Sequence, residues 1–172
     1  MPHAIRGILA VRCARPDKPQ KDSDMGWRDS GEIDKTQITL DSTLESVDQA
    51  ESTVLRMAGE AGLEEDDLHA LGMAVREAAV NAVVHGNRYN ARKKVHLKVA
   101  RTPDRLTIGI GDEGEGFALD NLADPLAPEN LLRQSGRGLL LIRAFVDEFE
   151  LVRRQPRGTE VRLVKYLAKA SE

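Results

Sequence analysis

The chain has 172 residues, of which 41% are apolar, and a formal charge of −3. This length supports one compact domain with a sizeable core, and the charge provides no overall attraction to nucleic acid. The single cysteine, Cys13, excludes an intrachain disulfide, and the lack of clustered cysteine and histidine argues against a structural zinc site. No apolar run approaches the roughly 18 residues that a membrane-spanning helix needs, so we expect a soluble, cytoplasmic protein.

The chain divides into an arm, one domain and a short tail. Residues 1–33 carry scattered prolines, glycines and charges without helical or strand periodicity, so we expect a flexible N-terminal arm. Residues 34–168 hold the periodic segments and are expected to form the domain, with 169–172 as a C-terminal tail. The domain opens with TQITL at 36–40, whose alternation predicts an edge strand.

Two helices are expected next. Ser42 or Ser46 can cap the first helix, which runs to about Gly62. The acidic run EEDD at 64–67 suits the positive end of a helix dipole. It therefore begins the second helix, which runs to Gly86, where glycine suits the end of a helix.

The remainder predicts two strand pairs separated by a loop and a helix. VHLKVA at 95–100 and RLTIGI at 105–110 form a hairpin. Residues 118–135 lack periodicity, and loops of this length commonly act as lids. GRGLLLIRAFVDE at 136–148 predicts a helix, and FELVRR and TEVRLVKY predict a second hairpin. This order predicts an α+β fold, a two-layer sandwich with a mostly antiparallel sheet covered on one face by helices.

Polar residues interrupt the apolar surface of the second helix. At about 100° per residue, Glu77, Asn81 and His85 fall between two apolar stripes. A carboxylate and a carboxamide one turn apart in such surroundings need hydrogen-bonding partners. A row of hydrogen-bonding groups on a helix surface would have the same pattern.

A glycine-rich segment, GDEGEGF at 111–117, follows the second strand of the first hairpin directly. An ionised Asp112 there can accept a hydrogen bond from an exocyclic amine, and Gly114 and Gly116 let a flat ligand approach the backbone. An ordinary acidic turn would look the same on its own. GIGDEG at 109–114 also fits the GxGxxG pattern, but a dinucleotide site needs a helix that begins inside the glycines, and these glycines exclude one.

A second glycine-rich segment, SGRG at 135–138, precedes the last expected helix. Free backbone N–H groups and the helix dipole favour phosphate at such a position. Arg133 and Arg137 add positive charge nearby. A glycine loop before any helix would share these features, and the chain has no GxxxxGK[ST] sequence of a P-loop protein.

Four segments in this order resemble the Bergerat-fold ATPases, the histidine-kinase-like group that contains gyrase, MutL and histidine kinases. These segments are REAAVNAVVHGN (76–87), DEGEGF (112–117), SGRGLLLIRAF (135–145) and GTEV (158–161). The likeness covers about residues 36–167. Within the group, the chain is most similar to the bacterial anti-sigma factor serine/threonine kinases.

The resemblance implies an ATP site with Mg²⁺. Glu77 would act as the general base toward a substrate serine, and Asn81 would coordinate Mg²⁺. Asp112 would accept a hydrogen bond from the adenine amine, with Gly114 and Gly116 beside the base. The remaining nucleotide-binding residues would be Arg133, Gly136, Arg137 and Gly138 at the phosphates and Thr159 at the adenine pocket.

The resemblance also implies partners. A kinase of this kind phosphorylates an anti-anti-sigma regulator of the sulfate-transporter-like class and sequesters a sigma factor, and homodimers are expected by analogy. Gln134 stands where a basic residue is expected, which favours a second reading: a non-catalytic, nucleotide-gated binding module. An ATPase that drives a mechanical cycle, as in gyrase or MutL, would need transducer domains for which this chain is too short.

Overall fold

The computed structural model describes residues 33–115 and 138–168, together with the backbone of 10–14 and the single positions 31 and 129. The loop expected at 118–135 and the tail at 169–172 lie outside these residues, apart from Glu129. None of the helices in the part that is described is long and apolar enough to cross a membrane.

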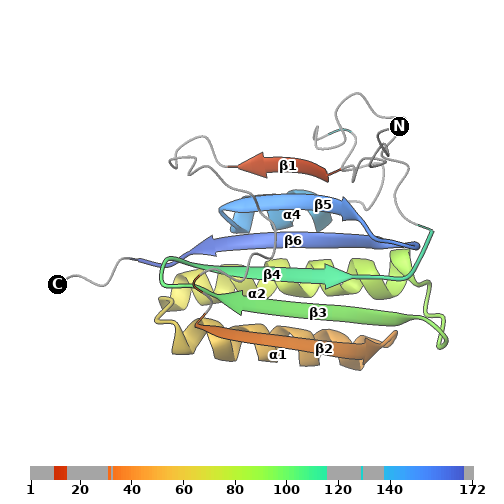
Figure 1. Ribbon diagram of the computed structural model, residues 1–172, viewed down its shortest axis with the longest axis horizontal. Coiled ribbons are helices and arrows are strands. Elements are labelled where there is room, and N and C mark those ends of the chain that lie inside the picture. The colour runs from red at the N-terminus through yellow and green to blue at the C-terminus, as the bar shows by residue number, and fades with distance from the viewer. Residues whose placement is uncertain (1–9, 15–30, 32, 116–128, 130–137, 169–172) are drawn as a thin grey trace, which may run out of the picture.

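Six antiparallel strands form one sheet in the order β1-β5-β6-β4-β3-β2 (Figure 1). The strands are β1 (Ala10–Ala14), β2 (Asp34–Asp41), β3 (Lys94–Arg101), β4 (Arg105–Gly111), β5 (Glu148–Arg153) and β6 (Thr159–Tyr166). Both predicted hairpins are confirmed, as β3 with β4 and β5 with β6. The predicted edge strand is β2, which pairs on one side with β3.

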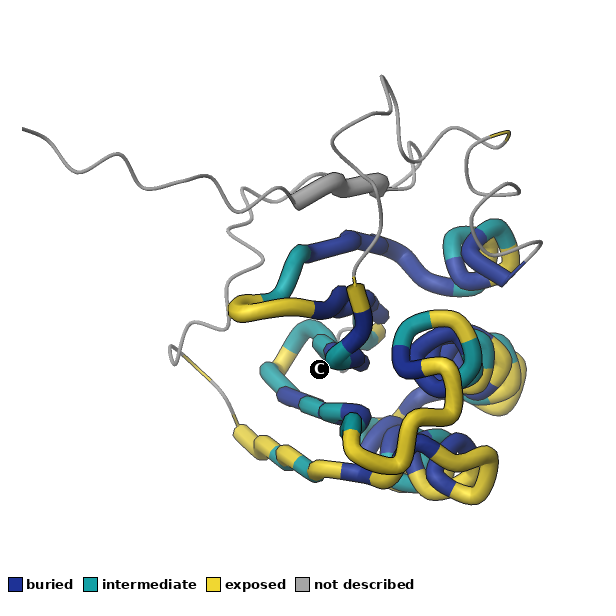
Figure 2. The backbone as a smooth tube through the Cα atoms, turned by 90° about the vertical axis from the view of Figure 1, so that its right-hand side faces the viewer, coloured by how far each residue is buried: buried dark blue, intermediate teal, exposed yellow. Residues whose placement is uncertain are grey.

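Helices cover one face of this sheet. They are α1 (Leu44–Glu60), α2 (Glu65–Val80) with its continuation η1 (Asn81–Gly86), and α4 (Gly138–Phe145). In Figure 2 the buried residues lie between the helices and the strands, so the predicted α+β two-layer sandwich is confirmed. Because α2 packs against both α1 and α4, it is the central helix of the layer.

Sequence periodicity explains how α1 packs, and a hydroxyl before it caps the helix. In α1, Val47, Ala50, Val54 and Met57 recur at intervals of three and four and are all buried. The Thr43 hydroxyl accepts a hydrogen bond from the Ser46 amide. The helix cap is therefore Thr43, and the expectation of Ser42 or Ser46 was wrong.

The predicted second helix is confirmed, but its last turn is unusual. From Asn81 to Gly86 the backbone is π-helical, and the Asn87 amide donates to the Ala82 carbonyl, five residues back, at 2.8 Å. Single π-helical turns of this kind are often found at functional sites. The turn contains Asn81, one of the residues expected to bind ligand.

Two expectations were wrong, one about the N-terminal residues and one about the end of the last helix. Residues 1–33 were expected to lack regular structure, but Ala10–Ala14 form β1, paired with Glu148–Val152 of β5. The last helix was expected to include Val146, Asp147 and Glu148, but it ends at Phe145. It stops there because Asp147 binds β6: its amide donates to Val164, and its carboxylate accepts from the Tyr166 amide.

Candidate functional site

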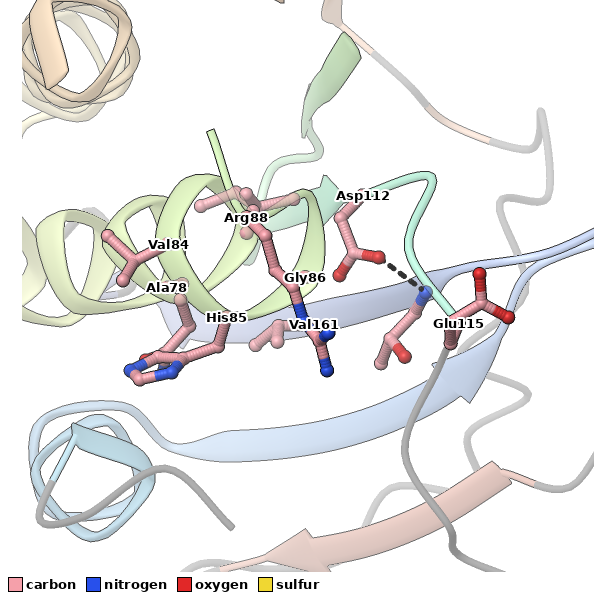
Figure 3. Close-up of a pocket in the computed structure, with 12 residues that line it drawn as sticks. Ala78, Val84, His85, Gly86, Arg88, Asp112, Glu115 and Val161 are labelled. Atoms are coloured by element: carbon pink, nitrogen blue, oxygen red, sulfur yellow. Dashed lines mark hydrogen bonds between the residues drawn. The ribbon is translucent and has the colours of Figure 1, made fainter. Parts of the chain in front are cut away.

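A cavity of about 460 Å³ lies between the C-terminal part of the α2 and η1 helix and the facing ends of β4 and β6. Its walls mix apolar and charged side chains (Figure 3). The lining residues are Ala78, Asn81, Ala82, Val84, His85, Gly86, Arg88, Ile110, Asp112, Glu115, Thr159 and Val161.

Asp112, directly after β4, is the buried carboxylate of the cavity and is only 7% exposed. Its Oδ1 accepts hydrogen bonds from the backbone amides of Gly114, at 2.8 Å, and Thr159, at 3.3 Å. Among the described residues no donor reaches Oδ2, so that oxygen can accept from a ligand. Burial raises the pKa of Asp112 above its ordinary value, although these backbone hydrogen bonds and the positive charge of Arg154 oppose the shift.

The backbone around Asp112 is packed so closely that two neighbouring positions require glycine. A Cβ at Gly86 would lie 2.4 Å from the Asp112 Cγ, and one at Gly114 would lie 2.1 Å from the Gly86 carbonyl oxygen. No real Cβ occupies such positions without movement of its neighbours. The absence of side chains here lets the end of η1 and the turn after β4 form one wall of the cavity.

The buried side chain of Asn87 also binds the turn that follows β4. Asn87, 1% exposed, accepts from the Glu113 amide through its Oδ1, at 2.8 Å. Its Nδ2 donates to the Ser42 hydroxyl and to the Lys94 carbonyl. The Glu113 carboxylate in turn pairs with His96 Nε2 at 2.8 Å, and this bond lowers the pKa of Glu113. We call these residues, Ser42, Asn87, His96 and Glu113, the brace.

Asn81 lines the cavity near α4, and Glu77 lies one helical turn before it, next to the lining residues and not among them. Asn81 is buried, and its Nδ2 is without a hydrogen-bonding partner among the described residues. A Cβ at Gly138, the first residue of α4, would lie 3.0 Å from Glu77 Oε2 and 3.3 Å from Asn81 Nδ2. An orphaned buried amide is costly, so this part of the site suits a bound polar group.

The structure brings the described candidate residues together. Asn81, Asp112 and Thr159 line the cavity, Gly114 binds Asp112, and Glu77 and Gly138 meet beside Asn81. The other candidates, Gly116, Arg133, Gly136 and Arg137, lie outside the described residues. Within the described part of the chain, no group of three or more histidine, cysteine, aspartate and glutamate side chains could hold a metal ion.

Sequence reasoning missed several parts of the site. Gly86 was interpreted as a helix end, whereas its closeness to Asp112 makes it part of the cavity wall. Arg88 and Glu115 line the cavity, and Arg154 donates from Nη1 to the Asp112 carbonyl at 2.8 Å. Gly86 lies within the HGN sequence at 85–87, one helical turn after Asn81, and Arg88 follows it directly; this sequence is the one signal that could have indicated them.

Comparison with known proteins identifies the family. Residues 40–165 match the family described as "Histidine kinase-like ATPase domain". Proteins named "Anti-sigma F factor" from Bacillus thuringiensis (strain Al Hakam) and Bacillus mycoides (strain KBAB4) are each 34% identical over 110 residues, which covers 62% of this chain and 74% of theirs.

A solved structure supports the fold independently. The crystal structure of the RsbU and RsbW domains of Rv1364c from Mycobacterium tuberculosis superposes with a TM-score of 0.58 and 19% identity. The match covers 81% of this chain and 34% of that longer chain. The chain therefore belongs to the histidine kinase-like ATPase family and, within it, to the anti-sigma factor kinases.

Proposed function

We propose that this protein transfers the γ-phosphate of ATP to a serine or threonine of a small regulatory protein. The observation that carries the proposal is one cavity with the buried carboxylate of Asp112 at one end and the buried, unpartnered amide of Asn81 at the other. Glu77 is not one of the lining residues, but its carboxylate lies close to the Asn81 amide beside Gly138. The two ends suit the two ends of a nucleoside triphosphate.

Adenine would bind at the Asp112 end. The exocyclic amine would donate to Oδ2, since both backbone donors go to Oδ1. Thr159, 3% exposed, closes this side: its carbonyl accepts from the Asp112 amide, and its own amide donates to Asp112 Oδ1. Gly86 and Gly114 are in close contact and carry no side chains, so a planar base could approach the backbone there.

Phosphate transfer would occur at the Glu77 end. The serine or threonine hydroxyl oxygen bonds to the γ-phosphorus as the bond from that phosphorus to the β–γ bridging oxygen breaks, and ADP leaves. Glu77 accepts the hydroxyl proton, a role that typically contributes about 10²–10⁴ in rate. It lies on a rigid helix, one turn from Asn81.

Mg²⁺ fits this end through Asn81. The carboxamide is buried and its nitrogen is unpartnered among the described residues, and a half-turn of the amide group would present its oxygen, the atom that can bind Mg²⁺. A bound Mg²⁺ would neutralise phosphate charge, and it ordinarily takes one or two protein ligands, with water and phosphate completing its shell. Gly138 together with Gly136, Arg137 and Arg133 would bind the phosphates.

The partners belong to the same proposal. The regulator would be an anti-anti-sigma protein of the sulfate-transporter-like class, and the kinase would also sequester a sigma factor, in the cytoplasm and as a homodimer. The likeness to proteins named anti-sigma F factor supports this assignment. Contact with nucleic acid is not part of it.

Transfer from γ-labelled ATP with Mg²⁺ to a panel of such regulators tests the proposal. Wild-type protein is expected to label a serine or threonine, and Glu77→Ala is expected to bind ATP without labelling. Tight ATP binding with no labelling across the panel would instead support the non-catalytic, nucleotide-gated module. Labelling that persists in Glu77→Ala would remove Glu77 from the mechanism.

A further inference from the structure

Arg88 occupies a turn that side chains rarely adopt. It follows η1, and both Arg88 and Tyr89 have positive φ, 52° and 55°. The Asn90 amide donates to the Asn87 carbonyl at 3.0 Å, which closes a four-residue turn around them. Turns with two positive φ values strongly prefer asparagine, aspartate and glycine at the central positions, so arginine and tyrosine are held here at an energetic cost.

The surrounding structure imposes this conformation. Asn87, which begins the turn, is fixed by its side-chain hydrogen bonds to Ser42 and Glu113, and the Tyr89 amide donates to the Val83 carbonyl at 3.0 Å. Strained backbone of this kind persists where the fold over-determines it, and it is concentrated at ligand sites. The consequence here is that the Arg88 side chain is directed to the cavity.

The charges of the residues that line the cavity suggest what Arg88 does. Arg88 lines the cavity and is an exposed residue, and Figure 3 draws its guanidinium between His85 and Glu115 in that view. Among the described lining residues it alone carries a permanent positive charge, whereas Asp112 and Glu115 are acidic. No hydrogen bond or ion pair joins Arg88 to another described residue, so the guanidinium is available to an anion.

We propose that Arg88 binds the phosphate chain of the nucleotide and makes the site selective for phosphorylated adenosine. This inference rests on the proposed function, because it assumes that a nucleotide occupies the cavity. A planar guanidinium can donate two parallel hydrogen bonds to phosphate oxygens, which is stronger and more directional than a point charge. Without Arg88, the described lining would present two carboxylates to a polyanion.

Binding of ATP, ADP, AMP and adenosine to the full chain, measured by calorimetry with Mg²⁺, tests the assignment. Arg88→Ala is expected to weaken ATP and ADP about 10- to 100-fold, the usual value of a charged hydrogen bond, and to leave adenosine unchanged. Arg88→Lys is expected to recover part of the loss. Arg92→Ala, which removes the same charge from an exposed residue outside the cavity lining, should bind like wild type.

Arg88→Gly separates binding from folding. Glycine adopts positive φ without cost, so this variant should raise the Tm while it weakens ATP as much as Arg88→Ala does. Equal weakening of all four ligands, or no weakening of ATP, would overturn the phosphate assignment. If wild type binds ATP but Arg88→Ala binds it equally well, only Arg88 is wrongly assigned; if wild type binds none of the four, the proposed function fails with it.

Discussion

The two ends of the cavity are built in opposite ways. At the Asp112 end, glycine contacts, backbone hydrogen bonds and the brace fix the carboxylate from several sides. At the Glu77 end, Asn81 lacks a partner for its amide nitrogen, and Gly138 leaves space beside both side chains. The difference indicates that the protein alone organises the end proposed for the base, whereas a ligand completes the end proposed for phosphate transfer.

The largest effect is expected from Glu77→Gln, which keeps the size of the side chain and removes its basicity. Phosphate transfer should fall about 10²–10⁴-fold because no group remains to accept the hydroxyl proton. ATP affinity, measured separately, should be unchanged. Glu45→Gln, at an exposed carboxylate on α1, is the matched control. Equal losses of ATP binding and of phosphate transfer would show that Glu77 also contributes to nucleotide binding.

Asp112→Asn tests the fixed end. The amide can still accept from Gly114 and Thr159, but it presents a weaker acceptor or a donor to the adenine amine. ATP affinity should fall about 10- to 100-fold, since hydrogen bonds to charged groups are worth about 1.5–3 kcal/mol. Calorimetric titration measures this loss. An affinity within error of wild type would move the base away from Asp112.

The same variant has the opposite effect on stability. Burial raises the folded-state pKa of Asp112, so the ionised group destabilises the empty fold at any pH above that pKa. An uncharged amide removes this cost. The Tm of the apoprotein at neutral pH should therefore stay the same or rise, and a clear fall would mean that the carboxylate stabilises the fold.

Two glycine substitutions compare the ends directly by stability. Gly114→Ala places a Cβ 2.1 Å from a backbone oxygen, which cannot give way, so it should cost about 1–3 kcal/mol or more. Gly138→Ala meets the flexible end of Glu77 at 3.0 Å and gains up to about 1 kcal/mol of helix propensity. Thermal unfolding should rank Gly114→Ala well below Gly138→Ala, and equal Tm values would contradict the contrast.

Sequence patterns predicted the elements and candidate residues that are determined by residues close to them in the chain. Alternation identified β3 and β4, and periodicity with the acidic start identified α2. Asp112 and Asn81 followed from motifs that include their own neighbours. The strand β1 was missed because it exists through its pairing with β5, whose sequence lies far along the chain.

Features that depend on distant partners had no such signal. The last helix ends early because β6 binds Asp147 through Val164 and Tyr166. Asn87 makes several side-chain hydrogen bonds only because Ser42 and Lys94 approach it from other parts of the fold. Arg88 was missed for a different reason: its turn lacks the asparagine and glycine that normally indicate two positive φ values.

The smallest expected effect, on pH dependence, comes from the brace. The hydrogen bond from His96 lowers the folded-state pKa of Glu113 below the ordinary 4.5, so Glu113 adds stability above pH 4.5 that is lost as the pH falls through the lowered value. Glu113→Gln should therefore lower the Tm modestly at pH 7, and the difference from wild type should shrink below pH 4.5. Glu115→Gln, at a more exposed carboxylate two residues on, should not show this convergence. A Tm difference that stays constant with pH would mean that the shape of Glu113 matters and its charge does not. In that case the Asp112 end of the cavity is not stabilised by this charge.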